Sequence, residues 1–211
     1  TVDDSAYLRA GYPEQEPVVL GEPAIMRDLR IIPVRFHPLR YDAAAGKVEV
    51  ARRIEVRITF EGEDLRNAKT GHAERIASSF DQLYRSLVIN YRGPRDGQHL
   101  GLGSYVIVCP DNATVLSLLE DLIDWRRSKG FDVYVATTAE TGTTTTSIQT
   151  WLRNAYTTWS NPPEYVTLVG DVDAGSAVLI PCWTYNSGAT DFPYAQLDGS
   201  DIVADAHVGR I

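Results

Sequence analysis

The stretch "YVTLVGDVDAGSAVLIP", residues 165–181, gives the clearest indication of the fold class. Its apolar run ends at Gly170, and two acidic residues, Asp171 and Asp173, follow almost directly. A short continuous apolar run bounded by turn residues is typical of a parallel strand that is buried on both faces. Because ligands of parallel α/β sheets bind beyond the carboxyl ends of the strands, we expect the two aspartates at an edge that can hold a site.

The segments before this stretch alternate between strand and helix. "YVIVCP" at 105–110 and "DVYVAT" at 132–137 are two further apolar runs of strand length. "TTTTSIQTWLRNAYTTW" at 143–159 starts with capping threonines and carries apolar residues at helical spacing. The order strand, helix, strand, helix, strand predicts a doubly wound parallel sheet that begins near residue 104.

The first helix of this half is bounded by recognisable end signals. Asp111 or Asn112 is predicted to cap a helix that runs to about Lys129, and Gly130 is predicted to end it. Side chains at the carboxyl ends of the strands then share one edge of the sheet. The residues expected there are Asp111, Thr137, Thr138 and Asp171.

The first half of the chain reads as antiparallel β structure. Apolar and polar residues alternate in "DLRIIPVRFHPLRYD" at 28–42 and again over 43–62, which predicts strands with one solvated face. The residues from Asp42 to Gly46 look like a turn, so 30–60 is predicted as a hairpin. Arg52 interrupts the apolar face and predicts a strand end or a kink.

A change in composition divides the chain. After a short helix expected around 74–85, "RGPRDGQHLGLG" at 92–103 is dominated by glycine, proline and charge, which is typical of a linker. We therefore expect a β-rich region with its junction linker at 1–98 and an α/β region at 104–211.

Composition excludes several classes of function. The 211 residues are 44% hydrophobic, enough for buried cores. The net charge of -8 disfavours nucleic acid or an anionic membrane as the main partner. No apolar stretch is long enough to span a bilayer, and no signal peptide is visible, which leaves open one removed upstream of Thr1. Two cysteines do not make a disulfide framework.

Two kinds of catalytic site find little support in the sequence. The first strand-to-helix turn, "CPDNAT" at 109–114, lacks the glycines of a dinucleotide or phosphate-binding loop. A nucleophilic pair would need Cys109 or Cys182 beside His207, and the local sequence supplies neither an electropositive neighbour nor a base. Cys109 reads instead as a small core residue of a buried strand.

Two other features carry a functional and a plain interpretation. Asp171, Asp173, Asp191 and Asp201 offer hard oxygen ligands in loops, which suits a structural Ca²⁺ ion, although aspartate is also the ordinary turn and cap residue. Asp198 and Asp205 add to the same acidic set. Arg92 and Arg95 lie in the predicted linker, where a processing protease would cut, or where a basic linker is simply solvated.

Short motifs in the second half resemble the gingipain-type cysteine peptidases, peptidase family C25. The family shows a strand ending in V-G-D, an I-P a few residues on, an S/T-D-x-x-Y segment, a G-x-D turn and then V-G-R. The helix and strand "LLEDLIDWRRSKGFDVYV" also look like the family's first helix and second strand. The resemblance covers all of 104–211. The matching residues are Val169, Gly170 and Asp171; Ile180 and Pro181; Thr190, Asp191 and Tyr194; Gly199 and Asp201; and Val208, Gly209 and Arg210.

The first half resembles the pro-region of the same family. "IIPVRFHPLRYDAAAGKVEVARRIEVRITFEG" looks like the β-rich end of that propeptide, and "FDQLYRSLVINYR" looks like its junction with the catalytic domain. The resemblance implies a sandwich-like β pro-region that inhibits the enzyme, assists its folding, contacts the catalytic domain and is removed by cleavage. It implies a caspase-like α/β subdomain for the second half. Arg92 and Arg95 are the positions that match a processing site after arginine.

The family's catalytic residues have no counterpart in this chain. Its histidine stands in a His-Gly context after the V-G-R segment and its cysteine ends a later strand, whereas His207 precedes Val208 and Cys182 precedes His207. The leading hypothesis is therefore part of a secreted or cell-surface cysteine endopeptidase zymogen, inactive by itself, whose Cys/His dyad lies beyond residue 211. The full enzyme would act on a peptide or protein. Two alternatives stay open: a non-catalytic α/β binding or adaptor module with a β appendage, and a small metal-dependent hydrolase or transferase.

Overall fold

The computed structural model describes residues 11–12, 14–69, 73–173 and 175–211. By its internal contacts the chain forms two compact units. Unit 1 comprises 1–23 and 32–66, and unit 2 comprises 24–31 and 67–211. The division therefore differs from the sequence division near residues 98–104, because two segments of the first half pack with the second half.

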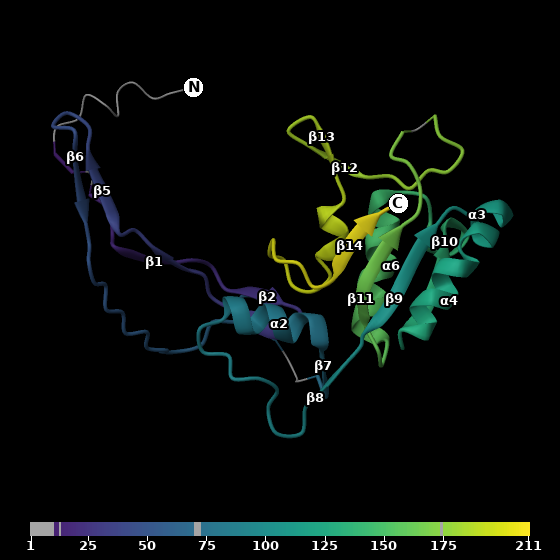
Figure 1. The fold of residues 1–211 in the computed structure, drawn as a ribbon, viewed down its shortest axis with the longest axis horizontal. Helices are drawn as coiled ribbons and strands as arrows, with labels where there is room; N and C mark the ends of the chain where they lie inside the picture. Colours follow the sequence, from purple (N-terminus) through teal and green to yellow (C-terminus); the bar gives the residue numbers. More distant parts are fainter. Residues whose placement is uncertain (1–10, 13, 70–72, 174) are drawn as a thin grey trace. The chain divides into compact units, whose positions relative to one another are not determined.

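Unit 2 is built on a four-stranded parallel sheet (Figure 1). Its strand order is β10-β9-β11-β14, so the first strand in sequence lies inside the sheet and the second lies at an edge. The parallel α/β region predicted from the apolar runs is confirmed. The bounds are β9 (Ser104–Cys109), β10 (Asp132–Thr137), β11 (Pro163–Leu168) and β14 (His207–Arg210).

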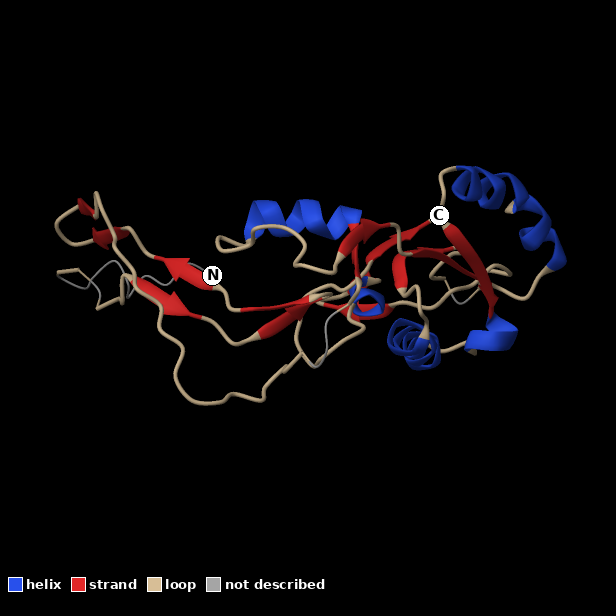
Figure 2. Ribbon diagram, turned by 90° about the horizontal axis from the view of Figure 1, so that it is seen from below, coloured by secondary structure: helices blue, strands red, loops and turns tan. Residues whose placement is uncertain are grey.

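Helices cover both faces of this sheet (Figure 2). The side chains of β9 alternate between two cores. Val106 and Val108 face a core that includes Ile148 and Leu152, whereas Tyr105, Ile107 and Cys109 face a core that includes Val115 and Leu119. This alternation is why the strand reads as a continuous apolar run. The helices are α3 (Ala113–Leu118), α4 (Glu120–Ser128), α5 (Thr138–Thr141) and α6 (Thr145–Thr158).

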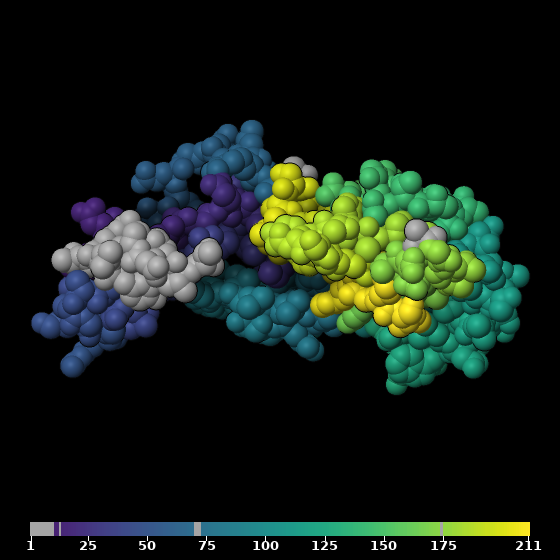
Figure 3. Space-filling model, turned by 90° about the horizontal axis from the view of Figure 1, so that it is seen from above, coloured from purple at the N-terminus to yellow at the C-terminus, as the bar shows by residue number. Residues whose placement is uncertain are grey.

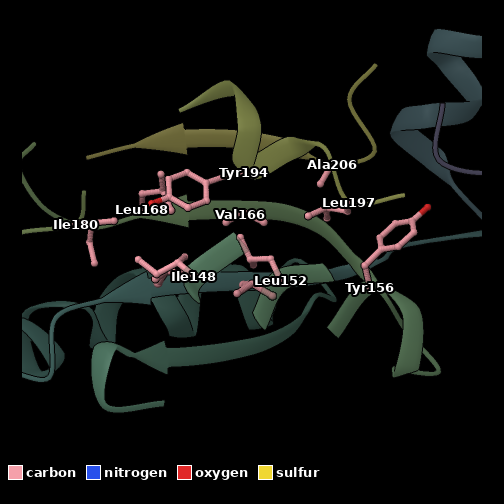
Figure 4. Packing of buried hydrophobic residues seen from close by; sticks show 11 residues of the cluster. Ile148, Leu152, Tyr156, Val166, Leu168, Ile180, Tyr194, Leu197 and Ala206 are labelled. Carbon is pink, nitrogen blue, oxygen red and sulfur yellow. The ribbon is translucent and has the colours of Figure 1, made fainter. Parts of the chain in front are cut away.

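The core on the α6 face is the larger of the two (Figure 4). Ile148 and Leu152 of α6 lie opposite Val166 and Leu168 of β11, and Tyr194 lies beside Leu168 in the same core. Tyr194 is fully buried, and its hydroxyl donates a hydrogen bond of 2.6 Å to the carbonyl of Pro181.

The helix ends follow the predicted capping signals. The Asn112 side chain accepts hydrogen bonds from Thr114 N–H and Val115 N–H, so Asn112 rather than Asp111 is the cap. A capping box between Thr144 and Ser147 begins α6. The first predicted helix is divided at Leu119 into α3 and α4, and Gly130 follows with φ +90° as the C-terminal signal requires.

Segments of the first half complete unit 2. The hairpin β2–β3, residues 24–31, and the helix α2 both belong to it. The helix expected at 74–85 begins later, at Ser78, because the residues before it form a strand that pairs in parallel with β8 from the predicted linker. The bounds are β2 (Ala24–Met26), β3 (Leu29–Ile31), β7 (Arg75–Ala77), α2 (Ser78–Leu87) and β8 (His99–Gly101).

Among its described residues, unit 1 contains two antiparallel ladders, β1 with β4 and β5 with β6, which confirms antiparallel β structure in the first half. The predicted turn after Asp42 is confirmed, since Ala45 N–H donates to the Asp42 side chain and Gly46 has φ +62°. The single hairpin predicted over 30–60 is wrong in two respects: β4 pairs with β1, and 54–60 forms no strand within the described residues. The bounds are β1 (Val18–Leu20), β4 (Val34–Phe36), β5 (Leu39–Asp42) and β6 (Lys47–Val50).

The last part of the chain lies over one face of unit 2, where its light-green to yellow residues form a continuous surface (Figure 3). It contains a small hairpin and a single helical turn before the final sheet strand. The elements are β12 (Trp183–Tyr185), β13 (Gly188–Thr190) and the 3-10 helix η1 (Phe192–Ala195). No helix of the described residues is long and apolar enough to cross a membrane.

Candidate functional site

The carboxyl edge of the sheet contains residues predicted from the strand ends. Asp111 N–H donates to the hydroxyl of Thr138 at 3.0 Å, so the ends of β9 and β10 are joined as expected. Asp171 follows β11, and its carboxylate accepts hydrogen bonds from Val172 N–H and Asp173 N–H. The Asp173 carboxylate accepts from Gly175 N–H. These two aspartates therefore shape their own loop.

Asp191 takes part in an ion pair that fixes the end of the last strand. Its two carboxylate oxygens accept hydrogen bonds of 2.8 and 2.6 Å from Nε and Nη2 of Arg210. The same guanidinium donates to the carbonyls of Gly170 and Ile180, each at 2.8 Å. A bidentate pair of this kind is a rigid connection, so Arg210 ties the edge loop to β14.

The four aspartates considered for calcium are not brought to one point. Asp201 accepts hydrogen bonds from Ile25 N–H and Val203 N–H, away from the partners of Asp171 and Asp191. Over 11–12, 14–69, 73–173 and 175–211, no three His, Cys, Asp or Glu side chains gather in a group that would hold a metal ion. Calcium binding stays a prediction.

A second cluster of polar residues lies where the hairpin β2–β3 meets the second half of the chain. Arg27 stands at the hairpin turn and is 4% exposed. Its Nη1 donates to the carbonyls of Pro163 at 2.5 Å and Asp205 at 3.0 Å, and its Nη2 donates to the carbonyl of Pro162 at 3.3 Å. The planar guanidinium carries five N–H donors in a fixed arrangement, so one buried side chain can donate to three carbonyls.

Asp205 receives the backbone of this hairpin. Its Oδ1 accepts a hydrogen bond of 2.8 Å from Arg27 N–H, and its Oδ2 accepts from Leu197 N–H and Asp198 N–H at the same distance. Asp205 is fully buried. Burial raises the pKa of Asp205 to about 6, although the three backbone N–H groups favour its ionised form.

A third buried network joins α2 to the sheet. Glu164, fully buried in β11, accepts hydrogen bonds of 2.5 Å from the hydroxyl of Ser79 and from Gly103 N–H. His207 Nε2 lies 2.9 Å from the same hydroxyl, and the imidazole packs against Phe80 and Tyr165 with ring centroids 4.9 Å away. Burial lowers the pKa of His207, an effect that the nearby Glu164 opposes.

The cysteines do not form a nucleophilic pair with this histidine. Cys109 is buried in the core of β9, and burial raises the pKa of its thiol, which is the reverse of what a nucleophile needs. Cys182 is half-buried in the loop before β12. The hydrogen bond of His207 goes to Ser79 instead.

The proposed processing residues lie in an accessible segment. Arg92 and Arg95 are exposed, and their segment, residues 91–98, contains no helix or strand. Arg92 Nη1 donates to two nearby carbonyls, those of Ile89 and Tyr91, and Arg95 N–H donates to the Gln98 side chain. The geometry is compatible with cleavage, which stays a prediction.

Sequence reasoning missed the residues that join the two halves. Glu164 had a visible signal, because it is the one charged residue within the buried strand "PEYVTL". Arg27 and Asp28 form the two-residue turn between "AIM" and "LRI", which is a hairpin pattern. Nothing local indicates that Arg27 is buried, since the carbonyls that accept hydrogen bonds from its guanidinium lie more than 130 residues further along the chain.

Both halves of the chain match known protein families. The family model described as "Peptidase family C25" matches residues 101–211, and "Propeptide_C25" matches residues 1–95. Lys-gingipain of Porphyromonas gingivalis is 27% identical over 202 residues, and gingipain R2 of the same organism is 26% identical over 199. Each alignment covers 92% of this chain, but only 11% of Lys-gingipain and 26% of gingipain R2. The chain thus spans about a tenth to a quarter of these relatives.

Among solved structures, the complex of the pro- and mature domains of Porphyromonas gingivalis RgpB is similar, with a TM-score of 0.45 and 25% identity. It covers 51% of this chain and 24% of that one. The membership itself rests on the two family models, which together match nearly the whole chain. With the peptidase model on more than half of its residues and the propeptide model before it, this chain belongs to peptidase family C25.

Proposed function

We propose that this chain is the front part of the precursor of a cysteine-type endopeptidase. Residues 1–95, the pro-region, precede residues 101–211, the beginning of the peptidase region. The observation that carries the proposal is this tandem match, together with curated relatives named gingipains. In the complete enzyme a thiolate attacks the scissile carbonyl of a peptide or protein substrate, and a histidine acts as acid and base.

The catalytic pair is proposed to lie outside residues 1–211. Neither Cys109 nor Cys182 shares a hydrogen bond with a histidine in the described part of the chain, and His207 contacts Ser79 and Phe80 instead. The resemblance further supports a caspase-like catalytic domain and a secreted or cell-surface location. A non-catalytic adaptor is the weaker candidate, because a family propeptide precedes the α/β region.

The pro-region is proposed to stay on the peptidase region until it is cut. Support comes from unit 2, in which the hairpin 24–31 and helix α2 pack with the sheet. Cleavage after Arg92 or Arg95 would separate the two regions covalently at an exposed segment. Removal of the pro-region is then the step that activates the precursor.

The test is to express the complete open reading frame and follow protein hydrolysis with and without a thiol-alkylating reagent. We expect thiol-dependent activity to appear together with a new N-terminus after Arg92 or Arg95. The double variant Arg92→Gln/Arg95→Gln should accumulate the uncut precursor, whereas Arg57→Gln, an exposed arginine of unit 1, should be processed normally. Thiol-dependent turnover by purified 1–211, or a complete precursor without any, would contradict the proposal.

A further inference from the structure

The tip of the hairpin β2–β3 has a conformation that ordinary residues avoid. Arg27 has φ +47°, in the left-handed region that is sparsely populated by residues other than glycine. Such a conformation persists only where the surroundings fix it. Here Tyr84 of α2 does so, because its hydroxyl accepts from Asp28 N–H at 3.0 Å and lies 2.9 Å from the carbonyl of Met26.

The pro-region thus builds a rigid turn that presents one arginine. Tyr84 is fully buried, and its ring lies 6.0 Å from that of Phe80. The Arg27 guanidinium in turn lies over the Phe80 ring, 5.2 Å from its centroid. Helix α2, which belongs to the pro-region, therefore contacts both the backbone of the turn and the Arg27 side chain, independently of the peptidase region.

The peptidase region supplies the matching receptor. The carbonyls of Pro162, Pro163 and Asp205 accept hydrogen bonds from the Arg27 guanidinium, and the Asp205 carboxylate accepts one from the Arg27 backbone N–H. Tyr156 also contacts the arginine. The Tyr156 hydroxyl donates to the Arg27 carbonyl at 3.1 Å, and its ring centroid lies 5.6 Å from the guanidinium carbon. Donor and acceptor groups are thereby paired on both the backbone and the side chain of one residue.

We propose that these residues form an arginine receptor on the peptidase region, and that Arg27 in it sets how long the pro-region stays bound once the linker is cut. The inference deepens the proposed function and rests on it for the cut itself. Contacts to a buried, hydrogen-bonded cation mainly affect the dissociation rate, because Arg27 must break all of them before the pro-region can leave. When the guanidinium is removed by mutation, the buried carbonyls that accepted its hydrogen bonds are left without a partner. Lysine cannot fully replace Arg27, since its ammonium group lacks the planar, fixed array of N–H donors of a guanidinium.

The experiment uses the full chain with a recognition sequence for a site-specific protease inserted between Asp96 and Gly97, both exposed. After the cut, the 97–211 piece is immobilised and the release of the 1–96 piece is timed. We expect the 1–96 piece to be released at least tenfold faster with Arg27→Ala than in the parent. With Arg27→Lys, the release rate should lie between these two values. Arg35→Ala, an exposed arginine of the same pro-region, is the matched control and should be released at the parent rate.

A second variant separates the side chain from the backbone strain. Arg27→Gly relieves the positive φ and removes the guanidinium, so it should still be released several-fold faster than the parent. Release of Arg27→Ala and Arg27→Gly within twofold of the parent would overturn the proposal. Failure of all the Arg27 variants to fold before the cut, judged by near-UV circular dichroism, would also overturn it, because Arg27 would then be part of the core. The inserted site makes these outcomes independent of natural processing at Arg92 or Arg95 and of peptidase activity.

Discussion

Strands β9 and β6 are both predicted from their apolar residues, β9 from a continuous run and β6 from alternation, but their surroundings are opposite. All six residues of β9 in unit 2 are buried, whereas all four residues of β6 in unit 1 are exposed, Val48 by 58%. The difference lies in the covering layers. Helices cover both faces of the β9 sheet, whereas β5 and β6 form a two-stranded ladder among the residues that the structure describes. An apolar run or alternation predicts a strand, but the strand becomes part of a core only where a further layer packs on its sheet.

The pro-region is divided between the exposed unit 1 and the well-packed unit 2. Its ladders β1–β4 and β5–β6 belong to unit 1, and its hairpin 24–31 and helix α2 belong to unit 2. In α2, Phe80 and Tyr84 are buried. The family boundary between propeptide and peptidase is therefore not the boundary between packed bodies, and stability should follow the packed bodies.

The largest expected effect contrasts the two units directly. Leu152→Ala removes a fully buried side chain between α6 and the sheet, and should lower the free energy of unfolding by about 2–5 kcal/mol. Val48→Ala in unit 1 should change it by less than about 0.5 kcal/mol. Denaturant unfolding followed by circular dichroism compares the two. Equal losses would mean that β6 has a covering layer after all.

A smaller, pH-dependent effect is expected at Asp205. Because burial raises its pKa from 3.8 to about 6, the folded state binds a proton that the unfolded state has released between these values. The Asp205 contribution to stability is therefore fully present below about pH 4 and is lost as the pH rises through about 6, by about 3 kcal/mol at most.

The check is the free energy of unfolding of Asp205→Asn and of the parent across pH 4 to 7. The parent should lose stability relative to the variant as the pH rises. Parallel curves would show that Asp205 ionises normally in the folded chain.

His207 should give a weaker effect of opposite sign. Burial lowers its pKa, so its contribution to stability is fully present above the unfolded pKa of about 6.5 and is lost as the pH falls below that value toward the lowered pKa of the folded chain. His207→Gln keeps a group for Ser79 and cannot be protonated. Measured on the same pH series, this variant should lose less stability than the parent on acidification below pH 7. A steeper loss in the variant would show that the protonated imidazole is favoured in the fold.

The smallest effect concerns reactivity rather than stability. Cys182 is half-buried in a loop, whereas Cys109 is buried in β9 and burial raises the pKa of its thiol. A neutral alkylating reagent should therefore label Cys182 first, and Cys109 only when unit 2 unfolds. Peptide mass spectrometry of the labelled chain measures which cysteine is alkylated first. Early labelling of Cys109 would mean that the core around β9 opens readily.

The sequence predicted those parts of the molecule that depend on local chemistry. The apolar runs predicted β9, β10 and β11, and the Asn112 and Thr144 caps begin helices near the expected positions. It also predicted a strand over 54–60 that the structure lacks, because alternation does not supply a partner strand. The hydrogen bond between Arg27 N–H and Asp205 spans 178 residues, and no window of sequence contains both ends.

Amide hydrogen exchange of the intact chain tests most directly whether pieces of the pro-region fold with the peptidase region. Peptides covering β2–β3 and α2 should exchange as slowly as those covering β9 and β11, and peptides covering 47–60 should exchange much faster. That pattern would establish unit 2 as the cooperative body. If instead the hairpin 24–31 exchanges as fast as 47–60 while β9 remains protected, the pro-region is not part of that body and Arg27 does not hold it on the peptidase region.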